Sequence, residues 1–347
     1  MRGDCVEMPN GSWVLVAPES FKYVSLELEA IASGYARIRV AYCGICGSDL
    51  HSYKGLHPNV KPPIVLGHEF SGTVEGVGLS EDASWIGCHV VASPSVPCGT
   101  CYQCETGNDH ICDDLKVVGN IAIPGAFAHY LDVPVDRLLP VPPDMPLADA
   151  ALVEPTAVAV HALKRVASYP EGIVVIGAGP IGMVTALVAK ARGVRRIALL
   201  DVREDRLARA RELGIEWTLN SRSEDVHAAL EEWYPNGPDA VFDCVAIPET
   251  VNLALREARK GSTIVLEGVP EGPMTVDAIL IQDRELRLLG TLMYQIPDFE
   301  EAIGLVQRGD ISSAKLVSRI VDLESVPSTF AELAQGSSED LKVLVKI

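Results

Sequence analysis

Four cysteines in one short segment constrain this chain more than any other feature of its sequence. Their spacing is C-x2-C-x2-C-x7-C, and they are Cys98, Cys101, Cys104 and Cys112. Four thiolates around one ion form the closed tetrahedral shell of structural zinc, which holds a lobe of chain together but leaves no position open for a substrate. An iron–sulfur cluster is the alternative, although the seven-residue gap departs from ferredoxin spacing. The array therefore predicts a structural zinc, and any catalysis must lie elsewhere.

The composition excludes several classes of function. The chain has 347 residues and is 48% hydrophobic, enough for two domains with a large core. Its 29 basic and 47 acidic residues give a formal net charge of −18, which disfavours nucleic acid and anionic lipid as partners. The longest uncharged apolar stretch, 173–189, is broken by Gly and Pro and is too short for a membrane span. Nine cysteines and no secretory signal at the start favour reduced thiols and a cytoplasmic location.

Three regions of the chain differ in their hydrophobic pattern. From about residue 13 to 143, short β-like runs are separated by Gly and Pro, which predicts an all-β lobe. From about 148 to 291, strands with apolar residues on both faces alternate with helices, which predicts a parallel doubly wound sheet. The last segment, 298–347, carries an amphipathic helix and a closing strand at 341–347.

A glycine-rich turn opens the first helix of the middle region. The strand-like run 173–176 leads into a G-x-G-x-x-G pattern, and a helix follows. In this context the pattern predicts a dinucleotide site, because unpaired amides and the helix dipole at a helix N-terminus attract a pyrophosphate. The residues assigned to it are Gly177, Gly179, Pro180, Ile181 and Gly182. A glycine turn that serves packing alone is the alternative.

An acidic residue closes the next strand, about 20 residues after the turn. This residue, Asp201, is expected to accept hydrogen bonds from the hydroxyls of the adenosine ribose and to repel a 2′-phosphate. The sequence therefore predicts NAD in preference to NADP. Arg203, two residues further on, weakens the expected preference for NAD.

The first lobe carries three more segments with reactive groups. Cys43 and Cys46 form a C-x-x-C pattern that suits a redox pair, half of a zinc knuckle, or one metal ligand beside a bystander. His68 and Glu69 stand side by side after an apolar run. Glu154 lies in an apolar segment, where a buried carboxylate is costly unless a cation such as a metal compensates it. Equally, Glu154 could lie at the mouth of a helix and interact with its dipole.

Taken in order, these motifs resemble the zinc-dependent medium-chain alcohol dehydrogenases over essentially the whole chain. The matching segments are 46–51, 67–69, the cysteine array, 154–155 and the glycine turn. Within the family they are similar to the polyol and diol branch of sorbitol and 2,3-butanediol dehydrogenases. The resemblance implies a Rossmann doubly wound parallel sheet domain at 153–296, which binds NAD, and a mainly β, GroES-like catalytic domain at 1–152 and 297–347. A homodimer or homotetramer is also implied.

The resemblance further implies a second, catalytic zinc. Alcohol dehydrogenases are a standard example of a Cys2His catalytic zinc site, so this assignment comes from the family and not from spacing. In the polyol branch a carboxylate replaces one cysteine. Cys46 and His68 resemble the fixed ligands, while Glu69 and Glu154 resemble carboxylates that bind the metal or hold its water. Cys43 then becomes a bystander.

The implied reaction is oxidation of a secondary alcohol to a ketone with hydride transfer to NAD. Zinc eases loss of the hydroxyl proton as a Lewis acid. Ser48 resembles the hydroxyl that accepts this proton, and His51 resembles the imidazole that passes it to solvent.

Two departures from the family bear on the substrate. Met293 and Tyr294 stand near the place where sorbitol dehydrogenases have an Arg-Tyr pair, so the arginine of that pair is missing here. A linear hexitol is therefore not favoured as the substrate. Diols, cyclitols and other polyols are expected instead. The segment 52–55 lacks the Asn-Trp-Asp signature of threonine 3-dehydrogenases. The alternatives are a threonine 3-dehydrogenase-like enzyme, an NADP-dependent aldehyde or ketone reductase, and a protein that binds NAD and zinc without catalysis.

Overall fold

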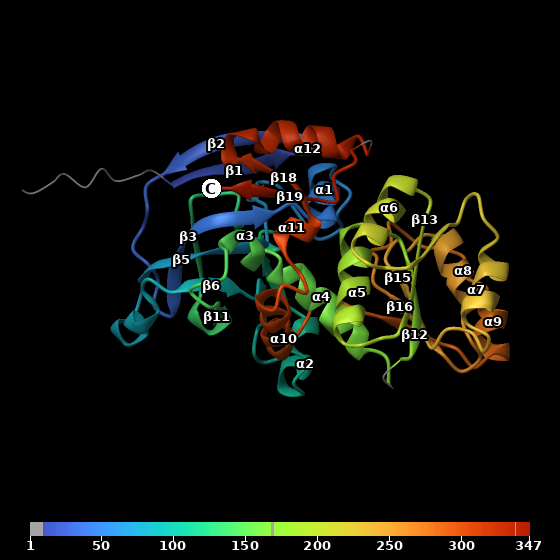
Figure 1. Ribbon diagram of the computed structural model, residues 1–347. Helices are drawn as coiled ribbons and strands as arrows, with labels where there is room; N and C mark the ends of the chain where they lie inside the picture. The colour runs from blue at the N-terminus through green and yellow to red at the C-terminus, as the bar shows by residue number, and fades with distance from the viewer. Residues whose placement is uncertain (1–9, 168–169, 337) are drawn as a thin grey trace, which may run out of the picture. The chain divides into compact units, whose positions relative to one another are not determined.

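Two compact units make up the chain, and each has its own sheets and core. The computed structural model describes residues 10–167, 170–336 and 338–347 (Figure 1). The first unit comprises Met1–Glu154 and Val317–Ile347, and the second comprises Pro155–Leu316. Within the described ranges, no helix is long and apolar enough to cross a membrane.

The first unit consists mainly of β-strands. Its largest sheet has the strand order β11-β6-β5-β3-β19-β18, with β10 paired to β3. These strands are β3 (Tyr35–Gly44), β5 (Glu69–Val77), β6 (His89–Ala92), β10 (Tyr130–Pro134), β11 (Leu138–Pro140), β18 (Val317–Asp322) and β19 (Lys342–Lys346). Two smaller sheets contain β1 (Asn10–Ala17), β2 (Ser20–Leu26) and β4 (Ile64–Val65), and β7 (Ser95–Val96), β8 (Lys116–Val118) and β9 (Ala122–Ile123).

Short helices complete the first unit and close its core. They are α1 (Gly47–Tyr53), α2 (Tyr102–Glu105), α3 (Leu147–Ala150) and α12 (Val326–Ala334), with 3-10 turns η1 (Ser80–Trp85), η2 (Asp109–Ile111), η3 (Val135–Arg137) and η4 (Leu323–Ser325). Phe330 of α12 lies against the rings of Phe21, Tyr53 and Phe127, with ring centroids 5.1 to 5.5 Å apart. The aromatic contacts explain why the C-terminal segment returns to the first unit, since such rings bury large apolar areas.

The second unit contains one fully parallel sheet of six strands. Its order is β14-β13-β12-β15-β16-β17, and the strands are β12 (Gly172–Ile176), β13 (Arg196–Asp201), β14 (Trp217–Asn220), β15 (Ala240–Asp243), β16 (Thr263–Leu266) and β17 (Arg287–Gly290). Every residue of β12 is buried, as expected for a central strand covered on both faces. The order reverses between β12 and β15, and ligands of such folds bind at the carboxyl ends of the strands beside this point.

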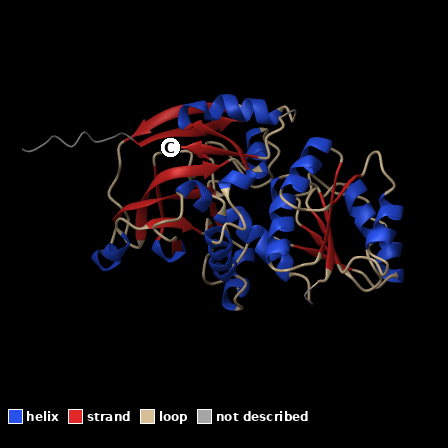
Figure 2. Ribbon diagram, viewed as in Figure 1, coloured by secondary structure: helices blue, strands red, loops and turns tan. Residues whose placement is uncertain are grey.

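Helices flank this sheet on both faces (Figure 2). The helices of this part of the chain are α4 (Val153–Lys164), α5 (Pro180–Ala191), α6 (Glu204–Glu212), α7 (Val226–Trp233), α8 (Pro248–Glu257), α9 (Ala278–Asp283), α10 (Ile296–Gln307) and α11 (Ser313–Leu316). The arrangement confirms the expected doubly wound α/β domain beside a mainly β domain.

The end of the second unit differs from the expectation. The sequence placed the return to the first domain at 297, whereas α10 and α11 belong to the second unit and the return falls at Val317. Polar contacts account for the difference. Asp298 of α10 lies 2.8 Å from the Nδ1 of His161 and accepts a hydrogen bond from Lys164 at 2.7 Å. Glu301 pairs with Arg192 of the chain segment that ends α5.

Two candidate metal centres and a candidate dinucleotide site

The four cysteines of the array converge in the first unit. Their sulfur atoms all lie within 4.8 Å of one another, and Cys101 Sγ is 3.5 Å from Cys104 Sγ and 3.8 Å from Cys112 Sγ. Four sulfurs about 2.3 Å from one zinc ion would be about 3.8 Å apart, so the spacing fits tetrahedral zinc. Backbone N–H groups support the thiolates, and the amide of Thr100 helps lower the pKa of Cys98 to about 6.

A second cluster joins three of the predicted catalytic ligands. The ligand atoms of Cys46, His68 and Glu69 lie within 4.8 Å of one another. Cys46 caps the N-terminus of α1, and Glu69 is the first residue of β5. Gly67 turns the chain with φ +100°, and a Cβ there would lie 2.8 Å from Cys43 Sγ. Glycine is therefore required just before the His–Glu pair.

The environment of this second cluster favours a cation. Asp49 and Glu69 are fully buried, and His68 is 7% exposed. The Nδ1 of His68 lies 3.5 Å from Asp49 Oδ1, which leaves Nε2 for a metal if the carboxylate orients the ring. Burial alone would lower the pKa of His68, but the charge and hydrogen bonding of Asp49 raise it well above its usual value. Oε1 of Glu69 is buried and accepts no hydrogen bond from a described residue, which suits a metal ligand.

Sequence reasoning missed Lys342, the buried cation beside this cluster. Its ammonium pairs with Glu69 Oε2 and donates to the carbonyl of Ile45 at 3.1 Å. Lys342 belongs to β19, and its side chain reaches Glu69 past Gly44 of β3, where a Cβ would collide with the Glu69 carboxylate. Burial opposes its charge, but Glu69, Cys46 and Glu154 raise the pKa of Lys342 above its usual value. Strand β19 has a lysine at each end, and no local signal in the sequence distinguishes the buried Lys342 from the exposed Lys346.

The remaining predicted residues of the first unit fall into different places. Glu154 is 7% exposed in the first turn of α4, and its ligand atom is not part of the cluster formed by described residues. Cys43 is fully buried in β3, and burial raises the pKa of its thiol well above the usual value. Ser48 and His51 lie on α1, one turn apart, so both project from the helix that Cys46 caps.

The glycine turn of the second unit has the strand–turn–helix form that the sequence predicted. Gly177 has φ +97°, and a Cβ there would lie 2.6 Å from Val245. A Cβ on Gly182 would collide with the carbonyl oxygen of Gly177, so α5 packs closely on β12 only with glycine at this position. Gly179 is the N-cap of α5 and Pro180 its first residue, with Ile181 next, which leaves free amides at the helix start.

The acidic residue at the end of β13 is held by the turn itself. Asp201 is 8% exposed and accepts hydrogen bonds from the amides of Ala178 at 2.6 Å and Arg203 at 2.8 Å. The guanidinium of Arg203 pairs with Asp205 at 2.6 Å. Arg206, which sequence reasoning missed, places Nη1 3.8 Å from Asp201 Oδ2. The carboxylate thus stands at the turn with its orientation fixed.

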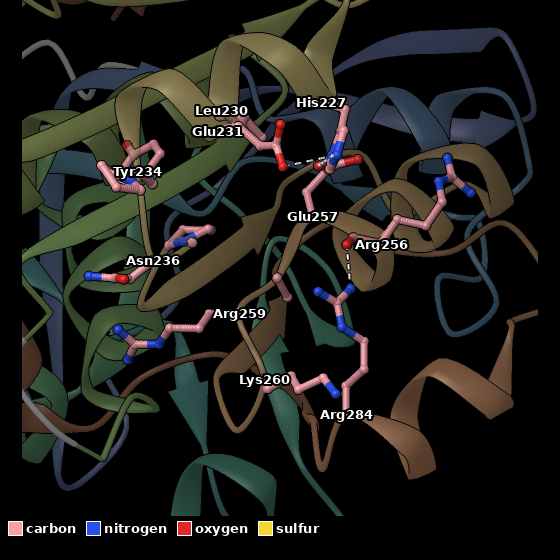
Figure 3. Close-up of a pocket in the computed structure, with 14 residues that line it drawn as sticks. His227, Leu230, Glu231, Tyr234, Asn236, Arg256, Glu257, Arg259, Lys260 and Arg284 are labelled. Atoms are coloured by element: carbon pink, nitrogen blue, oxygen red, sulfur yellow. Dashed lines mark hydrogen bonds and ion pairs between the residues drawn. The ribbon is translucent and has the colours of Figure 1, made fainter.

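A pocket of about 310 Å³ occurs at the other end of the same sheet (Figure 3). It is lined by segments that precede β15, β16 and β17, so it lies at the amino edge, away from the glycine turn. Two of its charged groups have protein partners: Arg284 donates to the Leu255 carbonyl, and Arg259 pairs with Asp239 at 2.8 Å. None of the predicted site residues lines it.

Comparison with known proteins agrees with this geometry. Residues 32–143 match the alcohol dehydrogenase GroES-like domain, and residues 180–308 match zinc-binding dehydrogenase. The 2-dehydro-3-deoxy-L-galactonate 5-dehydrogenase of Pseudoalteromonas atlantica is 33% identical, covering 95% of this chain and 97% of that protein. Sorbitol dehydrogenase of Arabidopsis thaliana is 33% identical over 84% of this chain and 83% of its own.

A solved structure extends the match to the whole fold. An alcohol dehydrogenase (rspB) from E. coli CFT073, complexed with NADH, has a TM-score of 0.90 and 27% identity, and covers 97% of this chain and 99% of its own. All of these matches are dehydrogenases; the family model describes a zinc-binding enzyme, and the solved structure contains NADH. The chain belongs to the zinc-binding medium-chain alcohol dehydrogenase family, in its polyol dehydrogenase branch.

Proposed function

We propose that this protein oxidises a secondary alcohol with a neighbouring hydroxyl group, such as a diol, polyol, cyclitol or sugar acid, to the ketone. NAD is the hydride acceptor, and a zinc ion held by Cys46, His68 and a carboxylate is the catalytic metal. The observation that carries the proposal is the convergence of these three ligand types in a largely buried cluster, where Lys342 is the cation that contacts one oxygen of Glu69. The relatives named above act on sugar-derived hydroxyls, which supports the substrate class.

The zinc ion and the residues around it have separate roles in the proposed reaction. Zinc supplies Lewis acidity at the substrate hydroxyl, and zinc can lower the pKa of a bound water from about 16 to about 7. Asp49 keeps His68 in one orientation. Ser48 accepts the hydroxyl proton and His51 transfers it to solvent, a division supported by their position on α1. The substrate C–H electron pair and proton leave together as hydride, and the carbon becomes a carbonyl.

Two carboxylates are available to the metal, and we assign the direct ligand to Glu69. One of its carboxylate oxygens lies within the cluster, whereas the ligand atom of Glu154 does not. Lys342 competes with the metal for Glu69 and keeps the carboxylate paired when the metal does not bind it. Glu154 then contributes negative charge to the site without binding the metal directly. Its charge also raises the pKa of Lys342.

NAD is preferred over NADP because Asp201 stands where a 2′-phosphate would lie. The carboxylate is held in place by two backbone amides, so it cannot swing away to admit the extra charge. The pairing of Arg203 with Asp205 leaves this cation less free to bind a phosphate, which supports the same choice.

We also propose that the protein self-associates through its second unit. Strand β17 forms one edge of the parallel sheet, and the flanking segments expose Ile279 at 74% and Leu292 at 57%. An edge strand with apolar neighbours favours pairing with a second copy. A homodimer or homotetramer is therefore proposed, in a reducing compartment such as the cytoplasm that keeps the zinc-binding thiols reduced.

The direct experiment is a panel of vicinal diols, polyols, cyclitols, sugar acids and threonine, assayed with NAD and NADP by absorbance of the reduced cofactor. A vicinal secondary alcohol is expected to react, with NAD favoured at least about tenfold in catalytic efficiency, or about 1.4 kcal/mol. The rate should rise with pH because oxidation releases a proton. Preference for NADP or for aldehyde reduction would contradict the assignment, and a zinc-loaded protein that binds NAD without any turnover would establish the non-catalytic alternative.

A further inference from the structure

A partly buried carboxyl group, which has no cationic partner among the described residues, lies in the second unit beside the proposed dinucleotide site. Glu267 follows β16 directly. Its two carboxyl oxygens accept hydrogen bonds from Thr185 Oγ1 at 2.9 and 3.1 Å, and one of them lies 3.2 Å from Cys244 Sγ. In the described part of the chain no ion pair involves Glu267. The partly desolvated position of Glu267 raises its pKa to about 7, and the hydrogen bonds from its two neutral neighbours only partly offset this effect.

The fold decides which part of a dinucleotide would lie near Glu267. Asp201 ends β13 and marks the adenosine side, and the glycine turn after β12 receives the pyrophosphate. Because β15 and β16 follow β12 in the sheet order, the other half of the molecule extends over their carboxyl ends. Those ends carry Cys244 and Glu267. The nicotinamide half is therefore the part that comes nearest to the Glu267 carboxyl group.

We propose that Glu267 is a specificity-determining residue that favours the oxidised cofactor over the reduced one. The nicotinamide ring of NAD⁺ carries a positive charge and that of NADH does not, so a carboxylate at the carboxyl end of β16 stabilises only the former. The pyrophosphate is common to both forms and cancels from the comparison. This inference rests on the proposed dinucleotide site.

The preference for NAD⁺ over NADH depends on pH because the Glu267 carboxyl group titrates. The groups that face its carboxyl are Thr185 on α5, which does not titrate, and Cys244 after β15, whose own pKa is raised well above its usual value by burial. Asp243, at the end of β15, is next to Cys244. Its carboxylate accepts hydrogen bonds from the Thr250 hydroxyl and from the backbone amides of Val245 and Ala246. Glu267 is therefore the group that changes charge near neutral pH. Binding of NAD⁺ favours its ionised form, so the affinity for NAD⁺ rises with pH through about 7.

The test compares the zinc-loaded wild type with Glu267→Gln by titration calorimetry and by NADH fluorescence. The ligands are NAD⁺, NADH and ADP-ribose, which lacks the nicotinamide, at pH 6 and pH 8. Glu231→Gln, an exposed residue at the opposite edge of the same domain, is the control. At pH 8 the Glu267→Gln variant should bind NAD⁺ about three- to tenfold more weakly, with NADH and ADP-ribose changed less than about twofold. At pH 6 the difference for NAD⁺ should nearly disappear.

Other outcomes of these binding measurements would contradict the role of Glu267. Equal weakening of all three ligands would assign Glu267 to packing and overturn the proposal, as would unchanged NAD⁺ binding at pH 8. If the wild type itself bound no ADP-ribose, the dinucleotide site would fail as well. Thr185→Val keeps the carboxyl group but removes the hydrogen bond that lowers its pKa. It should move the pH at which the NAD⁺ preference develops upward, and an unshifted profile would also contradict the inference.

Discussion

Two cysteines three residues apart have different environments in the first unit. Cys43 lies fully buried in β3, and Cys46 caps α1 beside His68 and Glu69. The C-x-x-C spacing alone left a redox pair, a zinc knuckle and a single ligand open, and the family resemblance selected Cys46. Lys342 could not be assigned in this way, because a lysine within a strand gives no sign of the distant residue with which it pairs. Only strand pairing across β3 brings it to Glu69.

Replacing Lys342 with Met tests its pairing with Glu69. Removal of one partner of a buried ion pair costs about 3 to 5 kcal/mol, because the other charge remains buried without compensation. The metal-free variant should therefore unfold at lower temperature, and added zinc should raise its Tm by more than it raises that of wild type. Thermal unfolding with and without zinc measures both effects. Lys346→Met, exposed on the same strand, is the control, and an equal loss in both variants would contradict the role of the pair.

At the scale of elements, the strand–turn–helix unit was predictable and the attachment of α10 was not. The glycine spacing is a local signal, since Gly177 is needed for the turn and Gly182 for the close approach of helix and strand. The amphipathic pattern near 299–306 predicted a helix, and α10 confirms it. A pattern of apolar residues does not identify the element on which they pack. The boundary at 297 was therefore misplaced, because the contacts of Asp298 with α4 join residues far apart in the sequence.

Alanine at two glycines of the turn should have different effects. A Cβ at Gly182 collides with the backbone of Gly177, whereas one at Gly179 lies 3.7 Å from the end of a flexible arginine side chain. Gly182→Ala should thus destabilise the second unit by more than about 1 kcal/mol, the scale of overpacking. Gly179→Ala should fold normally but bind ADP-ribose more weakly, because the methyl group obstructs the pyrophosphate. Calorimetry and thermal unfolding distinguish the two, and normal ADP-ribose binding by both variants would refute the site.

The attachment of α10 should depend on pH. Burial raises the pKa of Asp298, but hydrogen bonds from His161, the backbone of Gln295 and Lys164 outweigh it and lower the value to about 2. A carboxyl group with a depressed pKa stabilises the fold above about pH 4, and the contribution is lost as the pH falls towards 2. Asp298→Asn should reduce the free energy of unfolding by about 2 kcal/mol at pH 7. In urea unfolding this difference should shrink below pH 4, whereas the exposed Glu300→Gln should show neither effect.

At the scale of the whole molecule, each unit supports one part of the proposed chemistry. The first holds both candidate metal centres, and the second holds the candidate dinucleotide site. The order of the elements and the type of both domains followed from the sequence, because hydrophobic period and glycine spacing are local signals. Glu267 and Lys342 did not follow, since their environment is made by strands that meet only in the folded sheets.

The cysteine array should be needed for the stability of the first unit and not for chemistry. Replacing Cys104 with Ser removes one of four thiolates, so the variant should lose one zinc ion and unfold more easily. Zinc analysis and thermal unfolding measure these changes. Cys88→Ser, a cysteine outside the array whose thiol lies against the Ser84 carbonyl, is the matched control. Retention of full zinc content and stability by Cys104→Ser would refute the structural assignment.

Zinc content and turnover, measured on Cys46→Ser and Cys43→Ser beside the wild type, test the central claim most directly. The wild type should contain two zinc ions per chain and oxidise a vicinal secondary alcohol with NAD. Cys46→Ser should keep the fold and the array zinc, lose the second ion and lose turnover. Cys43→Ser should keep both ions and turnover, because its sulfur lies outside the cluster of described ligands. A Cys46→Ser protein with two zinc ions and full turnover, or an inactive Cys43→Ser protein with one, would contradict the account.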